Sequence, residues 1–205
     1  MNLKKPHLFS GSIISVFIAL HLFNHGYSIV SANKHIELMR TLRLFYRHVV
    51  VESILLMAIG IQIYSGLKLI NAKRHSASTL YQKLHVWTGL YLAFFFVIHL
   101  SAVFVGRFIL HLDTNFYFGV AGLNSFPANL FFIPYYVLAI LSFFGHVASI
   151  HSQKMTKQIV GLTPHAQATL ILILGVISTV AIFYGLTNHF HGVTIPNEYN
   201  ILIGK

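Results

Sequence analysis

Residues 88–100 read TGLYLAFFFVIHL, an apolar run with a single histidine, His99, near its end. Extended to 84–105, the run is long enough to cross a bilayer, which takes about 20 helical residues. Four further runs of this kind lie at 8–30, 48–70, 129–150 and 168–188. Lipid offers no partner for an unpaired backbone amide, so each run is predicted to be a helix. The sequence therefore predicts an all-α integral membrane bundle of five transmembrane helices, forming one domain (1–205).

The composition supports this class. Hydrophobic residues make up 56% of the chain and charged residues only 9%, whereas soluble domains carry about 25% charged residues. Cysteine is absent, which excludes disulfides and cysteine-ligated iron–sulfur clusters on this chain. The net charge of +10 is explained by Lys and Arg in loops that set topology and meet lipid headgroups, so it does not indicate binding to nucleic acid. Fourteen histidines against four acidic residues raise the question of a metal or haem.

Charge in the loops predicts the orientation. The first run is expected to be a retained helix, because it is longer than the apolar part of a signal peptide. With the N-terminus inside, eight of the fourteen Lys and Arg residues face inward and six outward. The positive-inside rule therefore favours an inside N-terminus, and a bacterial inner (cytoplasmic) membrane is the expected location.

Four of the six outer cations lie in segment 34–47, KHIELMRTLRLFYR. Arg40, Arg43 and Arg47 recur at helical spacing, which predicts a short amphipathic helix after the first span. Asn33 is its expected N-cap. The loop 107–128 is expected to fold back over the helix ends. No internal repeat is evident along the chain.

Polar side chains inside the spans are costly, so each is a candidate functional residue. Counted from the membrane edges at 1.5 Å per residue, His21 and His99 lie at the same depth in the outer half. Gln62 and His146 lie at the same depth in the inner half. Depth therefore sorts these four residues into an outer pair and an inner pair.

Two histidines level with each other on separate helices are what a bis-histidine haem b requires. The outer pair, His21 and His99, is the predicted axial pair. Arg40, Arg43 and Arg47 would lie above it, where haem propionates need cations. The alternative is that these histidines only hydrogen-bond helices together.

The inner pair does not predict a haem as directly as the outer pair does, because Gln62 is a poor haem ligand. Gln62 and His146 would hydrogen-bond each other or a quinone carbonyl. Fourteen residues separate His7 from His21, and also His85 from His99. That interval returns close to the same helix face about 21 Å further along. A second haem could therefore bind below the first, on His7 and His85 or on His85 and His146.

Further histidines gather on the outer side, where they predict either solvated interfacial residues or a divalent metal site or proton path: His25, His35, His48, His111, His189 and His191. Glu52 lies one helical turn from His48 and is expected to share a proton with it.

Four segments together resemble the five-span cytochrome b membrane anchor of succinate dehydrogenases and fumarate reductases: HLFNHG at His21, IQIYSG around Gln62, TGLYLAFFFVIHL to His99 and YYVLAILSFFGHV to His146. In that family spans one to four each present a haem ligand, the first and third for one haem and the second and fourth for the other. The resemblance implies that His21 and His99 share one haem and that His146 is half of a second pair. The family's second-span ligand falls at Gln62, where this chain has no histidine.

The expected function is a membrane cytochrome b that holds one haem b, or two, and passes electrons to or from quinone. The chain is not expected to be catalytic alone. The resemblance implies flavoprotein and iron–sulfur partners on the inner face. Two alternatives are a haem-binding sensor, anchor or assembly protein without quinone chemistry, and a histidine-rich metal-binding transporter.

Overall fold

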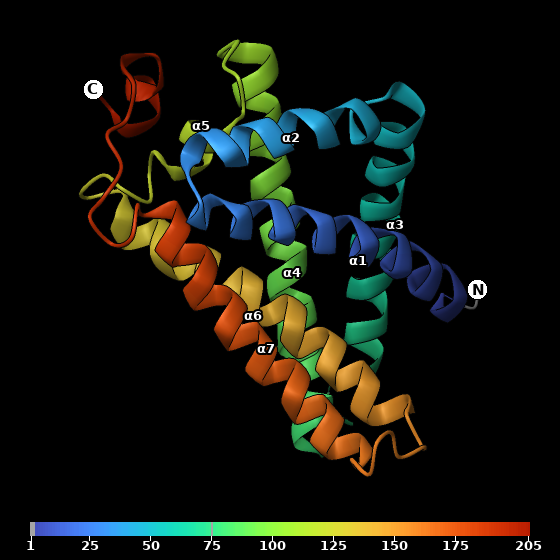
Figure 1. Cartoon of the computed structure of the whole chain (residues 1–205). Coiled ribbons are helices and arrows are strands. Elements are labelled where there is room, and N and C mark those ends of the chain that lie inside the picture. Colours follow the sequence, from blue (N-terminus) through green and yellow to red (C-terminus); the bar gives the residue numbers. More distant parts are fainter. Residues whose placement is uncertain (1–2, 75) are drawn as a thin grey trace.

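The computed structural model describes residues 3–74 and 76–205 (Figure 1). The prediction of an all-α membrane protein is confirmed, because five described helices are long and apolar enough to cross a membrane. They are α1 (Lys4–Gly26), α3 (Val49–Lys73), α4 (Leu80–Phe104), α6 (Asn129–Lys154) and α7 (Pro164–Leu186). The 3₁₀ turn η1 (Tyr27–Ile29) prolongs α1, and the π-turn η2 (Val105–Ile109) prolongs α4.

Polar caps explain why two of the helices begin before their apolar runs. Thr79 accepts a hydrogen bond from the Gln82 amide, and the Gln82 side chain bonds back, which forms a capping box at the start of α4. The Thr163 side chain accepts from the Ala166 amide at the start of α7, with Pro164 in the first turn. Both helices therefore start four residues before the predicted spans.

The spans pack as neighbouring pairs. α1 packs mainly on α3, α4 mainly on α6, and α6 also on α7 (Figure 1). Small residues allow close approach between these helices. A Cβ atom added at Gly145 of α6 would lie 3.0 Å from the Thr88 methyl group of α4.

A cap covers the end of the bundle at which α1 and α4 finish, and "outer" refers to this end from here on. It comprises α2 (Ala32–Tyr46), α5 (Phe116–Val120) and the 3₁₀ helix η3 (Asn197–Ile203). The amphipathic helix and the folded-back loop are thus confirmed, but Asn33 is not the N-cap of α2. The hydroxyl of Ser31 accepts from the Lys34 amide instead. Buried side chains of α5 and α7 form one apolar cluster under the cap.

Gly185 sets how closely α7 approaches η1. A Cβ atom there would lie 2.6 Å from the backbone nitrogen of Ile29, and backbone cannot move aside cheaply. We expect Gly185→Ala to lower the free energy of unfolding by about 1–3 kcal/mol, measured as a lower midpoint of thermal unfolding in detergent.

Gly60 provides the matched control, because it is exposed on α3 and an added Cβ would meet nothing within 4 Å. Gly60→Ala should leave the midpoint unchanged or raise it. Equal midpoints for both variants would contradict the close packing of α7 on η1.

Candidate functional site

The structure brings the outer histidines together. The ring centroids of His21 on α1 and His99 on α4 lie 6.1 Å apart, with an angle of 69° between the planes. Phe17 stacks on His21, and Phe95 stacks on His99 at 5.0 Å between centroids. Two aromatic neighbours thus fix the directions of the two imidazoles.

This spacing fits two ligands of one metal ion. A metal–imidazole bond is about 2 Å long, so two rings that share an ion have centroids about 6 Å apart once the ring radii are added. His21 and His99 therefore meet the distance requirement for a bis-histidine haem. They come from two separate helices, so the ion would lie between α1 and α4.

A chain of imidazoles leads outward from His21. Nε2 of His25 lies 3.1 Å from Nε2 of His21, and Nδ1 of His25 lies 3.3 Å from Nε2 of His35. The amide nitrogen of Asn24 lies 3.2 Å from the same Nε2 atom of His35. An imidazole nitrogen has one lone pair, so this atom accepts from either Asn24 or His25. Nδ1 of His35 and Oδ1 of Asn24 are buried with no partner among the described residues. The sequence placed His25 and His35 among the outer histidines, predicted to be interfacial residues or part of a metal site or proton path, but did not indicate that they contact each other.

His35 holds α2 against the span. It is 1% exposed, and its ring contacts Phe116 of α5 edge-on. Burial, together with the nearby His21 and Arg43, lowers its pKa to about 4. His35 is therefore neutral near pH 7, although it lies on a strongly basic helix.

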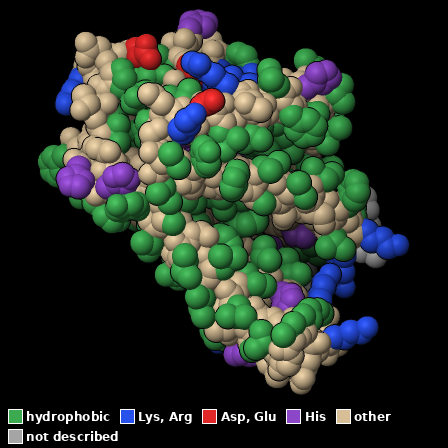
Figure 2. Space-filling model, in the orientation of Figure 1, with side chains coloured by type: hydrophobic (Ala, Val, Ile, Leu, Met, Phe, Trp, Pro, Cys, Tyr) green, Lys and Arg blue, Asp and Glu red, His purple; other side chains and the backbone are tan. Residues whose placement is uncertain are grey.

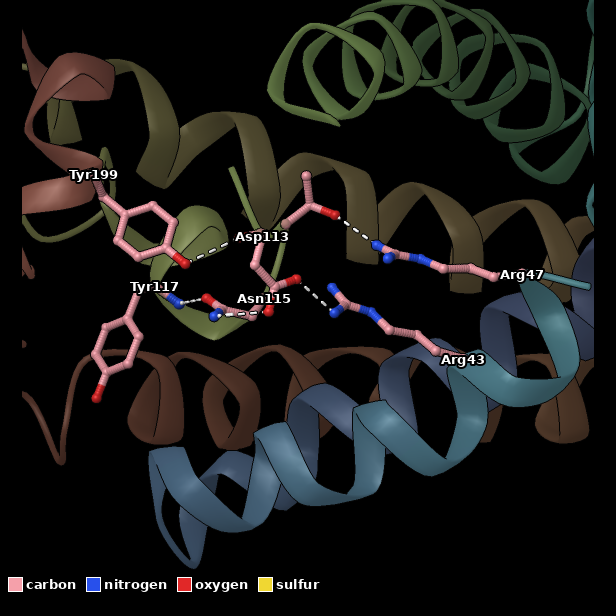
Figure 3. Close-up of polar contacts among 7 residues, drawn as sticks. Arg43, Arg47, Asp113, Asn115, Tyr117 and Tyr199 are labelled. Carbon is pink, nitrogen blue, oxygen red and sulfur yellow. Dashed lines mark hydrogen bonds and ion pairs between the residues drawn. The ribbon is translucent and has the colours of Figure 1, made fainter. Parts of the chain in front are cut away.

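The outer arginines bind the loop of the cap (Figure 3). Arg43 Nη1 lies 2.6 Å from Asp113 Oδ1, and Arg47 Nη2 donates to the Thr114 hydroxyl at 2.8 Å. The Tyr199 hydroxyl donates to the backbone oxygen of Asp113. Arg40, in contrast, is exposed. Cap formation thus accounts for Arg43 and Arg47 on the less basic side of the membrane.

Glu52 has a different partner from the expected one. Its carboxylate forms an ion pair with Arg107 at the end of α4, whereas His48 is exposed and precedes α3. The expected proton sharing between Glu52 and His48 is therefore replaced by an interhelical ion pair.

A cavity of about 800 Å³ lies in the inner half of the bundle, between α1, α3, α4 and α6. Its polar lining includes His7, Gln62, His85 and His146, and its remaining walls are largely apolar. Figure 2 shows histidine side chains set into a recess on this side of the molecule, beside lysine or arginine side chains. The volume lies within the range of pockets that bury small molecules and cofactors.

Within the cavity, Gln62 and His146 form hydrogen bonds with other residues and not with each other. Gln62 accepts from the Ser10 hydroxyl at 2.7 Å and contacts His7 Nε2 at 3.2 Å. His146 Nδ1 lies 3.2 Å from the Thr88 hydroxyl. Of the two alternatives predicted for this pair, the bond between Gln62 and His146 is therefore wrong, whereas a bond to a quinone carbonyl stays a prediction.

The sequence contains a weak internal repeat, contrary to the expectation of none. Segment 5–22, KPHLFSGSIISVFIALHL, aligns without gaps with segment 83–100, KLHVWTGLYLAFFFVIHL. The alignment matches His7 with His85 and His21 with His99. A comparison of the chain with itself at an offset of 78 residues would have found it, and it would have shown that His7 and His85 are equivalent residues.

No family model, curated protein or solved structure matched the chain. Across residues 3–74 and 76–205, no group of three or more histidine or acidic side chains has the geometry of a metal site. The argument for function therefore depends on the paired histidines and the cavity.

The buried His35 predicts that attachment of α2 depends on pH. Its pKa of about 4 lies below the ordinary value of 6.5, so the unfolded segment binds a proton first as the pH falls. The contribution of neutral His35 to the free energy of folding is fully present above pH 6.5 and is lost towards pH 4, by up to about 3 kcal/mol. The groups facing His35 are His25 and His21 from α1 and Arg43 from α2 itself. After correction for intrinsic rates, the α2 amides should exchange hydrogen faster at pH 5 than at pH 7.5.

His35→Gln keeps hydrogen-bonding groups but cannot become charged. This variant should show a smaller difference in α2 protection between the two pH values than the parent chain. An identical difference in both chains would show that His35 does not carry the pH dependence.

Proposed function

We propose that this chain is a membrane cytochrome b, in which His21 and His99 are the axial ligands of a haem b held between α1 and α4. The single observation that carries the proposal is the 6.1 Å separation of the two ring centroids. When bound, the haem supplies one-electron transfer. The role of the protein is to hold both imidazoles level in the outer half of the bundle.

The neighbours of the pair support this role. The contact from His25 to Nε2 of His21 occupies the atom that iron would take, so His25 would be released towards the outer rim. The Nε atom of Arg43 is buried with no partner among the described residues. We infer that this N–H is available for a propionate, whereas Arg40 points into solvent and Arg47 serves the cap.

Electron exchange with a quinone completes the proposed function. The cavity beside Gln62 and His146 combines apolar walls with hydrogen-bonding groups, as pockets for amphipathic ligands do. A quinone would bind there only where no haem fills the same space. The resemblance to succinate dehydrogenase and fumarate reductase anchors supports the same reaction. The chain would act as an electron-transfer subunit rather than as a complete enzyme.

The proposal includes partners and an orientation. On the inner side the sequence carries Lys73, Arg74, Lys83, Lys154 and Lys157, which would meet acidic surfaces of flavoprotein and iron–sulfur subunits. We infer from the excess of inner over outer cations that the N-terminus lies inside, and we propose a bacterial inner membrane as the location. A sensor or assembly protein would keep the haem but would not react with quinol. The described residues offer no observation that favours the metal transporter.

The first test is a reduced-minus-oxidised visible spectrum of the purified protein. A low-spin b-type spectrum is expected, and menaquinol or ubiquinol should produce it without dithionite. His21→Ala and His99→Ala should each remove the same haem, because neither imidazole alone gives six-coordinate iron.

His191→Ala is the matched control, since His191 is exposed on the outer side of the chain, and its spectrum should equal that of the parent. A parent spectrum without a b-type band, or a His21→Ala variant with the full haem content, would refute the proposed ligands. Haem that dithionite reduces but quinol does not would favour the sensor or assembly protein.

A further inference from the structure

The inner cavity is built from two equivalent halves. In the first half, His7 of α1 contacts the Gln62 side chain of α3 at 3.2 Å, and Ser10 donates to Gln62 at 2.7 Å. A Cβ atom on Gly11 would lie 3.2 Å from the same Gln62 amide. The residues of α1 thus surround the side chain of residue 62.

The second half repeats this arrangement on α4 and α6. His85 stacks on His146 at 4.3 Å between ring centroids, and Thr88 contacts Nδ1 of His146 at 3.2 Å. A Cβ atom on Gly89 would lie 3.2 Å from the same imidazole. His146 therefore contacts His85 in the second half as Gln62 contacts His7 in the first.

The repeat relates two pairs of histidines on α1 and α4. The outer pair, His21 and His99, consists of repeat-equivalent residues on α1 and α4, and their rings are neighbours. His7 and His85 are the repeat-equivalent residues fourteen positions earlier on the same two helices, and both line the inner cavity. We propose that His7 and His85 bind a second haem b in this cavity, and that Gln62 and His146 position these two ligands.

The bonding of His7 suits an iron ligand. Its Nδ1 lies 2.9 Å from the Ser65 hydroxyl, whose own proton goes to a backbone oxygen of α3. Nδ1 of His7 therefore donates, which leaves Nε2 as the basic atom. Metal-binding histidines are held in this way, with the second nitrogen donating to a neighbour. The contact at Nε2 is a flexible amide of Gln62 that iron would displace.

The cavity also provides room and charge for the tetrapyrrole. A further glycine of its wall, Gly66, faces the His7 ring, and a Cβ atom there would lie 3.3 Å from its Cε1 atom. Lys4 and Lys154 lie among the lining residues at the inner ends of α1 and α6, where propionates would meet them. The two haems would be about 21 Å apart along the helices, at 1.5 Å per residue.

This assignment differs from the one that the anchor resemblance implies, in which His146 is a ligand and Gln62 is a missing one. In the present proposal the lack of a histidine at position 62 costs no ligand, because α1 supplies His7. The electron-transfer role of the inner haem rests on the proposed function, whereas its binding does not.

The test counts haem per chain by pyridine haemochrome and records the low-temperature electron paramagnetic resonance spectrum of the same sample. The parent chain should hold two haems. His7→Ala and His85→Ala should each hold one, and the double variant should also hold one, because both remove the same haem. Gln62→Ala and His146→Ala should keep two, with shifted g values and midpoint potential for one of them. His165→Ala is the control, as His165 is exposed on α7.

One haem in the parent chain would overturn the proposal, and so would loss of a haem in His146→Ala but not in His85→Ala. His7→Met keeps an axial ligand if His7→Ala fails to fold. It should retain two haems with an altered signal, and an unaltered signal would also overturn the proposal. Retention of both haems in His21→Ala would refute the outer site alone and leave the inner one intact.

Discussion

Polar side chains in a hydrocarbon environment must find partners inside the protein, and this constraint organises the whole bundle. Each intramembrane imidazole or amide contacts a side chain of another helix or of the next helical turn, such as Ser65 for His7 and His25 for His21. These contacts fix the rotation of α1, which apolar packing alone would leave loosely defined. Order in the bundle therefore comes from a few bonds that are unusually costly to lose.

The two polar layers belong to different structural settings. The outer layer is closed by a folded cap, and its histidine chain ends at the buried His35. The inner layer surrounds a cavity whose lining reaches lysines at the helix ends. A planar ligand in the outer layer would be shielded from water by α2 and α5. A ligand in the inner layer would lie near the surface where a partner subunit could dock.

Much of the fold could be predicted from the sequence, because apolar runs of sufficient length have one stable form in lipid. Depth along each span correctly placed His21 beside His99. Depth is only one coordinate, however, and uniformly apolar helices carry no pattern that reveals which face packs inward. The separate partners of Gln62 and His146 therefore could not be predicted. The bond from Arg43 to Asp113 joins residues seventy positions apart, and no local pattern indicates it.

The parallel repeat has a consequence for how unlike the two halves can become. A symmetric dimer made of a single helical hairpin would carry the same residue at both equivalent positions of its interface. Joining both hairpins in one polypeptide removes that restriction, so an amide can stand at position 62 and an imidazole at position 146. The two sides of one central ligand then experience different fields, and each can be adjusted by substitution without altering the other.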